Sequence, residues 1–310
     1  MELPSFVVFA RYPRVVRLLF PSRWRRLLAF RRHQEQTYLP LVAQVRNNRR
    51  NSEEDSHGSK RKTYVDMLLE ARVREDNDRA LTDGEIVSLF SEFLGVTTET
   101  TASSLQWTMA NLVKHPEMQQ KLRNEVDANA GDDGTIVEDG LSRMPYLKAV
   151  VLESLRRHPP IPFELRQVTD VKEAAEVLNR RLPDSGAPVN FLISKIGRDP
   201  EVWPEPMAFR PERFMPGGEG HGVDLACARE MKMMPFGAGR RACPGTAMAL
   251  LHLKFFVANL VREFEWWEVE GQEVDLTDFH AVILTVMKSP LRARLVARRS
   301  ASSATAQAAN

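Results

Sequence analysis

Apolar residues recur with helical spacing through the first part of the chain. Residues 1–50 indicate two basic amphipathic helices, the longer of them over 22–46. Thr82 and Glu85 have the spacing of a capping box, in which each side chain accepts a hydrogen bond from the other residue's backbone N–H. No proline interrupts the sequence from there to His115, so we expect one long helix over this stretch.

Three more helices are expected downstream, each bounded by residues that begin or break helices. In chain order they span residues 116–130, 145–158 and 244–264. Pro116 suits the first turn of its helix, where an N–H has no partner to lose. Pro159 and Pro160 end the second of these helices, because proline cannot continue the backbone hydrogen bonding.

The remaining segments carry short apolar runs or turn residues, which indicates strands and loops. Pieces at Phe163–Val168 and Pro188–Ile193 predict a small sheet, and residues 265–298 predict a β-hairpin. We expect an exposed polar loop over 47–62, an ordered meander over 199–235 and a disordered tail over 299–310. Together these elements predict a mainly α fold with a small β portion, in one domain over residues 1–298.

Composition and charge exclude several classes of protein. With 310 residues and 43% hydrophobic content, the chain can bury a sizeable core. Its net charge of +2 gives no general attraction to nucleic acid. The two cysteines, Cys227 and Cys243, are too few for a disulfide framework or a four-ligand zinc site. No run approaches the ~20 apolar residues that span a bilayer, so we expect no membrane anchor in this chain.

The opening segment is rich in arginine and poor in acidic residues, as mitochondrial presequences are. Pro13, Pro21 and Pro40, together with the helical pattern over 22–46, favour a folded helical region instead. We therefore treat this segment as part of the fold.

One cysteine stands at the start of the last helix, in PFGAGRRACPGTAMALLHLKFFVANLV. The glycines of this loop allow tight turns and close approach to a flat cofactor, and backbone N–H groups at a helix start can donate to a thiolate. Arg241 precedes Cys243 by two residues, where its guanidinium can pair with an acidic group on a cofactor rim, and Phe236 can cover the sulfur from water. An inert cysteine in a glycine-rich turn explains the segment equally well on these residues alone.

These residues resemble the haem-binding signature of the cytochrome P450 family, F-x-x-G-x-R-x-C-x-G. The matching positions are Phe236, Gly239, Arg241, Cys243 and Gly245. The resemblance extends over nearly the whole chain, is closest to plant microsomal members and implies the family's fold. It implies haem b as cofactor, with Cys243 as axial ligand of the iron and a thiolate that favours O–O cleavage. The implied reaction inserts one oxygen atom into a small apolar organic substrate, with electrons from NADPH-cytochrome P450 reductase.

Two further motifs gain a role from this resemblance. Glu153 and Arg156 are three apart and share a helix face, as an ion pair requires, although a solvated surface pair is the ordinary alternative. They resemble the family's E-x-x-R pair, and Arg213 in PERF resembles the third member of a buried structural triad that locks the cysteine loop. Arg166 resembles the basic residue that contacts a haem propionate.

The threonine-rich sequence GVTTETT, residues 95–101, interrupts the apolar face of the long helix. The resemblance implies that Glu99 and Thr100 relay protons to the reacting oxygen, with haem held between this helix and the Cys243 helix. The alternative is an ordinary helix whose hydroxyls bond back to its own carbonyls. Thr97 stands where the family usually has glycine, and we expect its branched side chain to narrow the oxygen pocket.

The resemblance begins in the middle of the family's fold. We expect the chain to lack the membrane helix, the first small sheet and a Trp/Arg pair that contacts a propionate. The family location is the cytosolic face of the endoplasmic reticulum, and Lys254 and Arg240 are candidates for facing an acidic reductase. Three hypotheses follow: a monooxygenase, a non-catalytic truncated remnant, and a helical interaction module, the last of which leaves the five-position signature unexplained.

Overall fold

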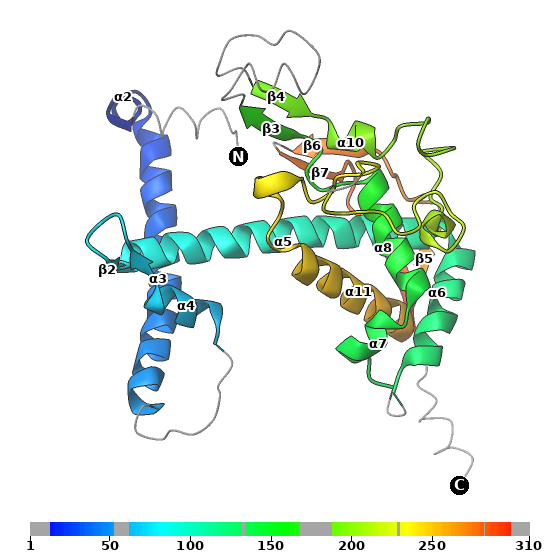
Figure 1. Ribbon diagram of the computed structural model, residues 1–310, viewed down its shortest axis with the longest axis horizontal. Coiled ribbons are helices and arrows are strands. Elements are labelled where there is room, and N and C mark those ends of the chain that lie inside the picture. Colours follow the sequence, from blue (N-terminus) through cyan, green and yellow to red (C-terminus); the bar gives the residue numbers. More distant parts are fainter. Residues whose placement is uncertain are drawn as a thin grey trace. The chain divides into compact units, whose positions relative to one another are not determined.

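The computed structural model of the protein describes residues 13–52, 62–131, 134–167, 188–227, 230–281 and 283–298 (Figure 1). The chain divides into two compact units, Met1–Thr98 and Glu99–Asn310. Helix α5, Asp83–Lys114, belongs to both, since it begins in the first unit and ends in the second. The single domain expected over residues 1–298 therefore contains two units. The tail at 299–310 lies outside the described residues.

The first unit is built around one long helix. Its elements are α2 (Pro13–Leu19), α3 (Pro21–Ser52), α4 (Tyr64–Glu70) and an antiparallel strand pair, β1 (Arg72–Val73) with β2 (Arg79–Ala80). The two predicted helices are confirmed, but the loop expected over 47–62 is wrong for residues 47–52. Neither glycine nor proline occurs between Leu41 and Ser52, so nothing in the sequence stops the helix there. Residues 53–61 lie outside the described part.

The start of α5 confirms the predicted capping box. The backbone N–H of Thr82 donates to Glu85 Oε2 at 2.8 Å, and the Glu85 N–H donates to Thr82 Oγ1 at 3.3 Å. The guanidinium of Arg79 also binds the Glu85 carboxylate, and these hydrogen bonds hold the pKa of Glu85 well below its usual range. The helix then runs without a break to Lys114, as the absence of proline predicts.

The second unit is a helical body around a shared apolar core. After α5 come α6 (Pro116–Asn129), α7 (Glu138–Ser142), α8 (Pro145–Arg157), α10 (Ile193–Ile196) and α11 (Thr246–Glu263), with 3-10 turns η1 (Pro211–Phe214) and η2 (Gly239–Arg241). The three downstream helices are confirmed to within two residues at each end. Leu112, Leu122, Leu147 and Val257, from α5, α6, α8 and α11, are fully buried together. Their burial fixes how these helices pack.

Three antiparallel strand pairs complete this unit. They are β3 (Glu164–Gln167) with β4 (Pro188–Phe191), β5 (Phe264–Glu268) with β8 (Ala293–Ala297), and β6 (Asp278–Ala281) with β7 (Leu284–Met287). The predicted small sheet is confirmed as β3–β4. The single hairpin expected over 265–298 is wrong, because two separate pairs form, with β6–β7 between β5 and β8 along the chain. Pro290 follows β7 and prevents that strand from continuing into β8.

Candidate functional site

The Glu153 carboxylate lies in the interior of the second unit, bound to two guanidinium groups. Its oxygens accept from Arg156 Nε at 2.7 Å and Nη2 at 2.8 Å, and Arg213 Nε lies 3.4 Å away as an ion pair. All three side chains are fully buried. The i, i+3 spacing places Glu153 and Arg156 on one face of α8, and η1 brings Arg213 to them. The pair is therefore internal, which excludes the solvated alternative.

The triad also fastens the irregular segment that precedes the cysteine loop. Arg156 donates to the carbonyl oxygens of Gly197 and Pro206, and Arg213 donates to the carbonyl of Glu205 and to the Glu219 carboxylate. These contacts make residues 199–227 an ordered meander. A side chain at Gly197 has no room, because its Cβ would lie 2.4 Å from the Arg156 carbonyl oxygen. The meander is thus held by buried charge rather than by a sheet.

The cysteine loop folds tightly before α11. The Cys243 N–H donates to the Phe236 carbonyl at 2.8 Å, which closes the loop over PFGAGRRAC. Gly237 and Gly239 have φ of 71° and 67°, a region that favours glycine, so the glycines of this sequence suit the backbone conformation of the loop. Gly245 stands at the N-cap of α11 and its carbonyl accepts the first helical hydrogen bond, from Ala249. The loop therefore delivers the cysteine sulfur to the beginning of the helix.

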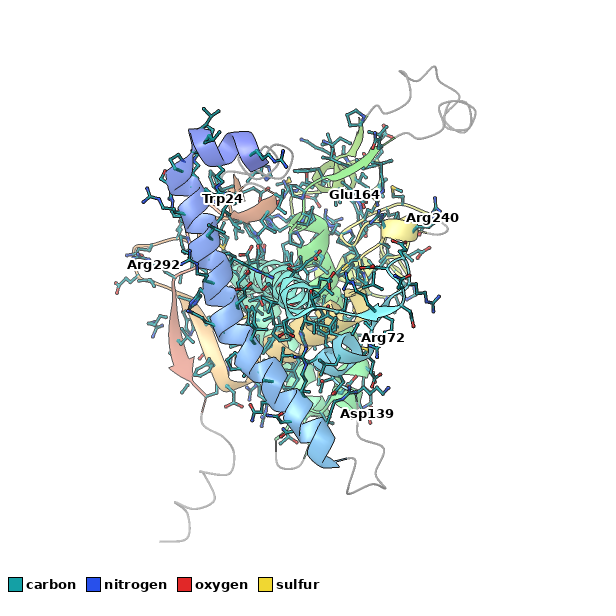
Figure 2. The ribbon with its side chains drawn as sticks, turned by 90° about the vertical axis from the view of Figure 1, so that its left-hand side faces the viewer. Trp24, Arg72, Asp139, Glu164, Arg240 and Arg292 are labelled. Atoms are coloured by element: carbon teal, nitrogen blue, oxygen red, sulfur yellow. The ribbon has the colours of Figure 1, made fainter. Side chains whose placement is uncertain are left out.

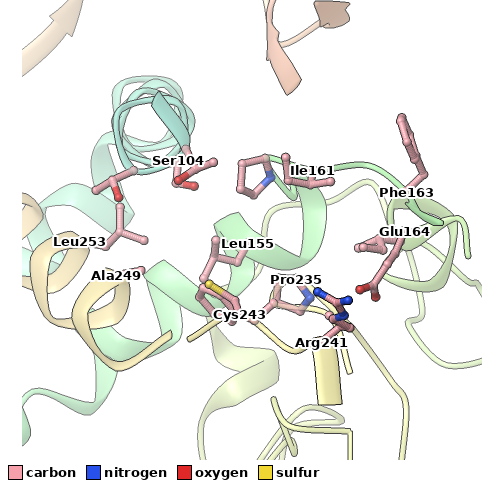
Figure 3. Close-up of a pocket in the computed structure, with 16 residues that line it drawn as sticks. Ser104, Leu155, Ile161, Phe163, Glu164, Pro235, Arg241, Cys243, Ala249 and Leu253 are labelled. Carbon is pink, nitrogen blue, oxygen red and sulfur yellow. The ribbon is translucent and has the colours of Figure 1, made fainter. Parts of the chain in front are cut away.

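A pocket of about 220 Å³ lies in front of this sulfur. Its lining residues come from six parts of the second unit: Thr100, Thr101 and Ser104 of α5; Leu155 of α8; Pro160, Ile161, Phe163 and Glu164; Ile193 of α10; Pro235, Phe236, Gly237, Arg241 and Cys243 of the loop; and Ala249 and Leu253 of α11. Figure 3 shows the Cys243 sulfur between Leu155 and Ala249, with Ser104 on the helix across the pocket. The structure thus places Cys243 and the threonine-bearing helix on opposite sides of one cavity.

The candidate residues of α5 divide between two cavities. Thr100 lines the cysteine pocket, whereas Glu99 lines a second and more open one of about 690 Å³ that also contains Gln106 and Trp266. Glu99 is not among the residues that line the cysteine pocket, so of this pair only Thr100 borders the cavity in front of the sulfur. The Thr97 hydroxyl donates to the Phe93 carbonyl at 2.8 Å, as expected of a hydroxyl that bonds back to its own helix.

Strand β3 places two charged residues on its covered side. Glu164 and Arg166 are partly buried, while the apolar Leu165 between them is 58% exposed. Arg166 Nη2 donates to Glu164 Oε1 and lies 3.4 Å from the Ala238 carbonyl. Arg166 therefore reaches the cysteine loop, as expected of a residue near the cofactor, but it is bound to an internal carboxylate. The i, i+2 spacing of two charges in a predicted strand was the sequence signal for this pair.

A second buried polar cluster holds the wall of the pocket, and sequence reasoning missed it. The His158 ring stacks on Trp107 with centroids 3.8 Å apart, and its Nδ1 lies 3.0 Å from Asp278 Oδ1. Burial lowers the pKa of His158 to about 4. Burial alone would raise the pKa of Asp278, but hydrogen bonds from His158 and Arg198 lower it to about 2. Because 120 positions separate His158 from Asp278, no local pattern connects them.

Comparison with known proteins relates the whole arrangement to one family. The family model described as "Cytochrome P450" matches residues 1–295. Cytochrome P450 89A9 of Arabidopsis thaliana is 42% identical over 305 residues, which are 95% of this chain and 57% of that protein. Flavonoid 3'-monooxygenase of Arabidopsis thaliana is 36% identical over 219 residues, which are 69% of this chain and 42% of that protein.

A solved structure gives the same relationship in three dimensions. The retinoic acid-bound cyanobacterial CYP120A1 is similar with a TM-score of 0.63 and 25% identity, over 84% of this chain and 56% of that one. The chain spans about half the length of the curated relatives it matches. Among the described residues, none of the helices has the length and hydropathy needed to cross a bilayer.

Proposed function

This chain belongs to the cytochrome P450 family, whose cofactor is haem, and we propose that its Cys243 thiolate is the axial ligand of a haem b iron. The observation that carries the proposal is the position of the sulfur. Cys243 Sγ lines a cavity whose opposite wall carries Thr100 and Thr101 of α5, and the apolar residues Ala249 and Leu253 of α11 line the same cavity. A lone structural cysteine would have no need of such a cavity.

The residues around the pocket suit a flat, mostly apolar group with an acidic rim. Leu155, Ile161 and Leu253 supply apolar walls, and Arg241 supplies a cation at one end. The volume of about 220 Å³ is smaller than the ~300–1,000 Å³ of pockets that hold small molecules, so side chains must move to admit the macrocycle.

Each residue of the loop then has a definite task. The Cys243 sulfur would hold the iron, and the Phe236 ring, which lines the same pocket, would help to shield this otherwise exposed cysteine from water once the cofactor is bound. The Arg241 guanidinium pairs with a carboxylate on the rim of the cofactor. When bound, the thiolate-ligated haem supplies dioxygen activation, with electron density from sulfur favouring O–O cleavage. The Glu153 triad acts at a distance, by fixing the meander that leads into the loop.

Proton delivery is proposed to involve both α5 residues, in separate positions. Thr100 Oγ1 holds a proton inside the cysteine pocket, on the side opposite the sulfur. Glu99 takes protons from the second cavity, which is more open and reaches polar Gln106. Glu99 directly precedes Thr100 on α5, so a proton would pass between neighbouring residues of one helix.

For the whole protein we propose a monooxygenase that acts on a small apolar organic substrate at the cytosolic face of the endoplasmic reticulum. NADPH-cytochrome P450 reductase is the proposed electron donor. Arg240 is exposed in the loop just before Cys243, and Figure 2 shows its side chain extending away from that loop. Lys254 is only partly exposed on α11, whereas Arg240 is exposed in the loop. Arg240 is the stronger candidate for contact with an acidic partner.

The proposal is tested by the difference spectrum of the ferrous carbon monoxide complex after haem is added to the purified chain. The red-shifted Soret band of a thiolate-ligated haem is expected for the unmodified chain and for Cys227→Ser, whose thiol lies in the meander. Cys243→Ser is expected to lose that band. A red-shifted band that persists in Cys243→Ser, or no haem uptake by the unmodified chain, would contradict the assignment.

A further inference from the structure

The Glu164 carboxylate lies at the end of the pocket where the acidic rim of the proposed haem would need a cation. Its side chain is 17% exposed and lines the cavity together with Arg241 and Cys243. Strand β3 turns Glu164 and Arg166 towards the loop and leaves Leu165 in solvent, the reverse of the usual burial of apolar residues. A strand that hides charge and exposes leucine indicates a role for the charged side.

The Glu164 carboxylate already holds one guanidinium group that an acidic cofactor would use, that of Arg166, and lines the same pocket as a second, that of Arg241. Arg166 Nη2 donates to Glu164 Oε1. Figure 3 shows the carboxylate of Glu164 and the guanidinium of Arg241 pointing towards one another at the same end of the pocket. A Cβ placed on Gly237 would lie 3.0 Å from Glu164 Oε1, so the carboxylate also rests directly on the cysteine loop.

We propose that Glu164 is an internal competitor of the haem carboxylates for Arg166 and Arg241, and that it must turn away before haem is fully seated. The inference rests on the proposed function, since it assumes that the pocket takes haem. It concerns a different property, the affinity for the acidic rim of the cofactor. A haem carboxylate placed against the same guanidinium groups would be repelled by Glu164 and would share their donors with it, so the charge of Glu164 weakens the hold on the cofactor rim.

Removing the charge of Glu164 should therefore tighten haem binding. Glu164→Gln keeps the size of the side chain and an oxygen that accepts from Arg166, but it leaves the guanidinium charge uncompensated for a haem carboxylate. Because the pair is partly exposed, solvent screens it, and we expect about a fivefold lower Kd for haem, within the range of such ion pairs. The gain should shrink as salt is added, because exposed charges are screened.

The experiment titrates haem into the full apo chain and follows the Soret absorbance. Glu164→Gln and Glu164→Ala are compared with the unmodified chain and with Glu201→Gln, which removes an exposed carboxylate outside the pocket. A parallel titration uses haem dimethyl ester, whose carboxylates are blocked. Circular dichroism of each apo chain checks that it is folded.

The proposal expects both Glu164 variants to bind haem more tightly, Glu201→Gln to match the unmodified chain, and the ester to bind all four equally well. Equal or weaker haem binding by the Glu164 variants would overturn it, and so would an equal gain with the ester. A thiolate spectrum with unchanged Kd values sinks this inference alone. No haem uptake by any of the four chains sinks the proposed function as well.

Discussion

Replacing Glu153 with glutamine should destabilise the second unit more than replacing any other carboxylate side chain with its amide. The carboxylate accepts two hydrogen bonds from Arg156 and a third from the Arg210 backbone N–H at 2.9 Å. Arg213 adds an ion pair at 3.4 Å. The amide of Glu153→Gln keeps one acceptor oxygen but turns a donor towards a guanidinium that can itself only donate.

The magnitude follows from burial. With Glu153 gone, Arg156 has only carbonyl oxygens left, and Arg213 keeps the partly exposed Glu219. Breaking a buried ion pair on one side costs about 3–5 kcal/mol, because the remaining charge stays out of water without a counter-ion. A domain has about 5–15 kcal/mol of stability in total, so much of it is lost. Haem uptake should fall with it, since the triad holds the meander before the cysteine loop.

Urea unfolding followed by tryptophan fluorescence measures this directly, because Trp203 is buried with its ring 5.3 Å from the Arg156 guanidinium carbon. Glu219→Gln is the matched control. It removes a carboxylate that binds Arg213 at the edge of the cluster, and it should cost less than about 1 kcal/mol of unfolding free energy. If Glu153→Gln unfolds within about 1 kcal/mol of the unmodified chain and takes up haem normally, the triad is not what holds this unit together.

Three other expectations can be checked separately. The pKa of His158 in the folded chain, about 4, lies below the ordinary 6.5, so the unfolded chain binds the proton of this histidine more readily. The free energy of unfolding should therefore fall by up to ~3 kcal/mol as the pH is lowered from 6.5 to 4. A urea midpoint that does not change over that pH range would contradict this. Gly197→Ala should lower the free energy of unfolding by about 1–3 kcal/mol in thermal unfolding, because the new Cβ clashes with Arg156. Gly95→Ala, in an open helical position, should raise it by up to ~1 kcal/mol. Equal effects of the two substitutions would refute the packing argument. In a reconstituted system with reductase, Thr100→Ala should lower product formed per NADPH consumed, and an unchanged ratio would count against its proton role.

Much of the fold follows from local signals in the sequence. The capping box at Thr82, the absence of proline up to Lys114 and the proline stops after α8 each act over a few residues, and each predicted its helix correctly. The pairing of Glu153 with Arg156 could also be predicted, since i, i+3 spacing puts the two residues on one face of the helix. The spacing alone did not predict their burial, because burial depends on the meander that covers them; that prediction came from the resemblance to the family's buried triad.

The parts that sequence reasoning missed depend on contacts between distant segments. His158 and Asp278 meet only because β6 packs beside the end of α8, and the Thr285 N–H fixes that packing by donating to the Pro160 carbonyl at 2.8 Å. The separation of β6–β7 from β5–β8 differs from this case, because Pro290 is a local signal that ends β7, and the prediction of a single hairpin did not use it. Glu164 shows a mixed case: its pairing with Arg166 can be predicted from their spacing in the strand, but its position against the cysteine loop depends on contacts between distant segments.

The central claim, that the Cys243 sulfur binds iron, is tested most directly by X-ray absorption at the iron edge of the haem-reconstituted chain. A sulfur scatterer bound to the iron is expected in the unmodified chain and in Cys227→Ser, and should be absent from Cys243→Ser. Iron surrounded only by nitrogen and oxygen in the unmodified chain, or a sulfur ligand that survives in Cys243→Ser, would contradict the account.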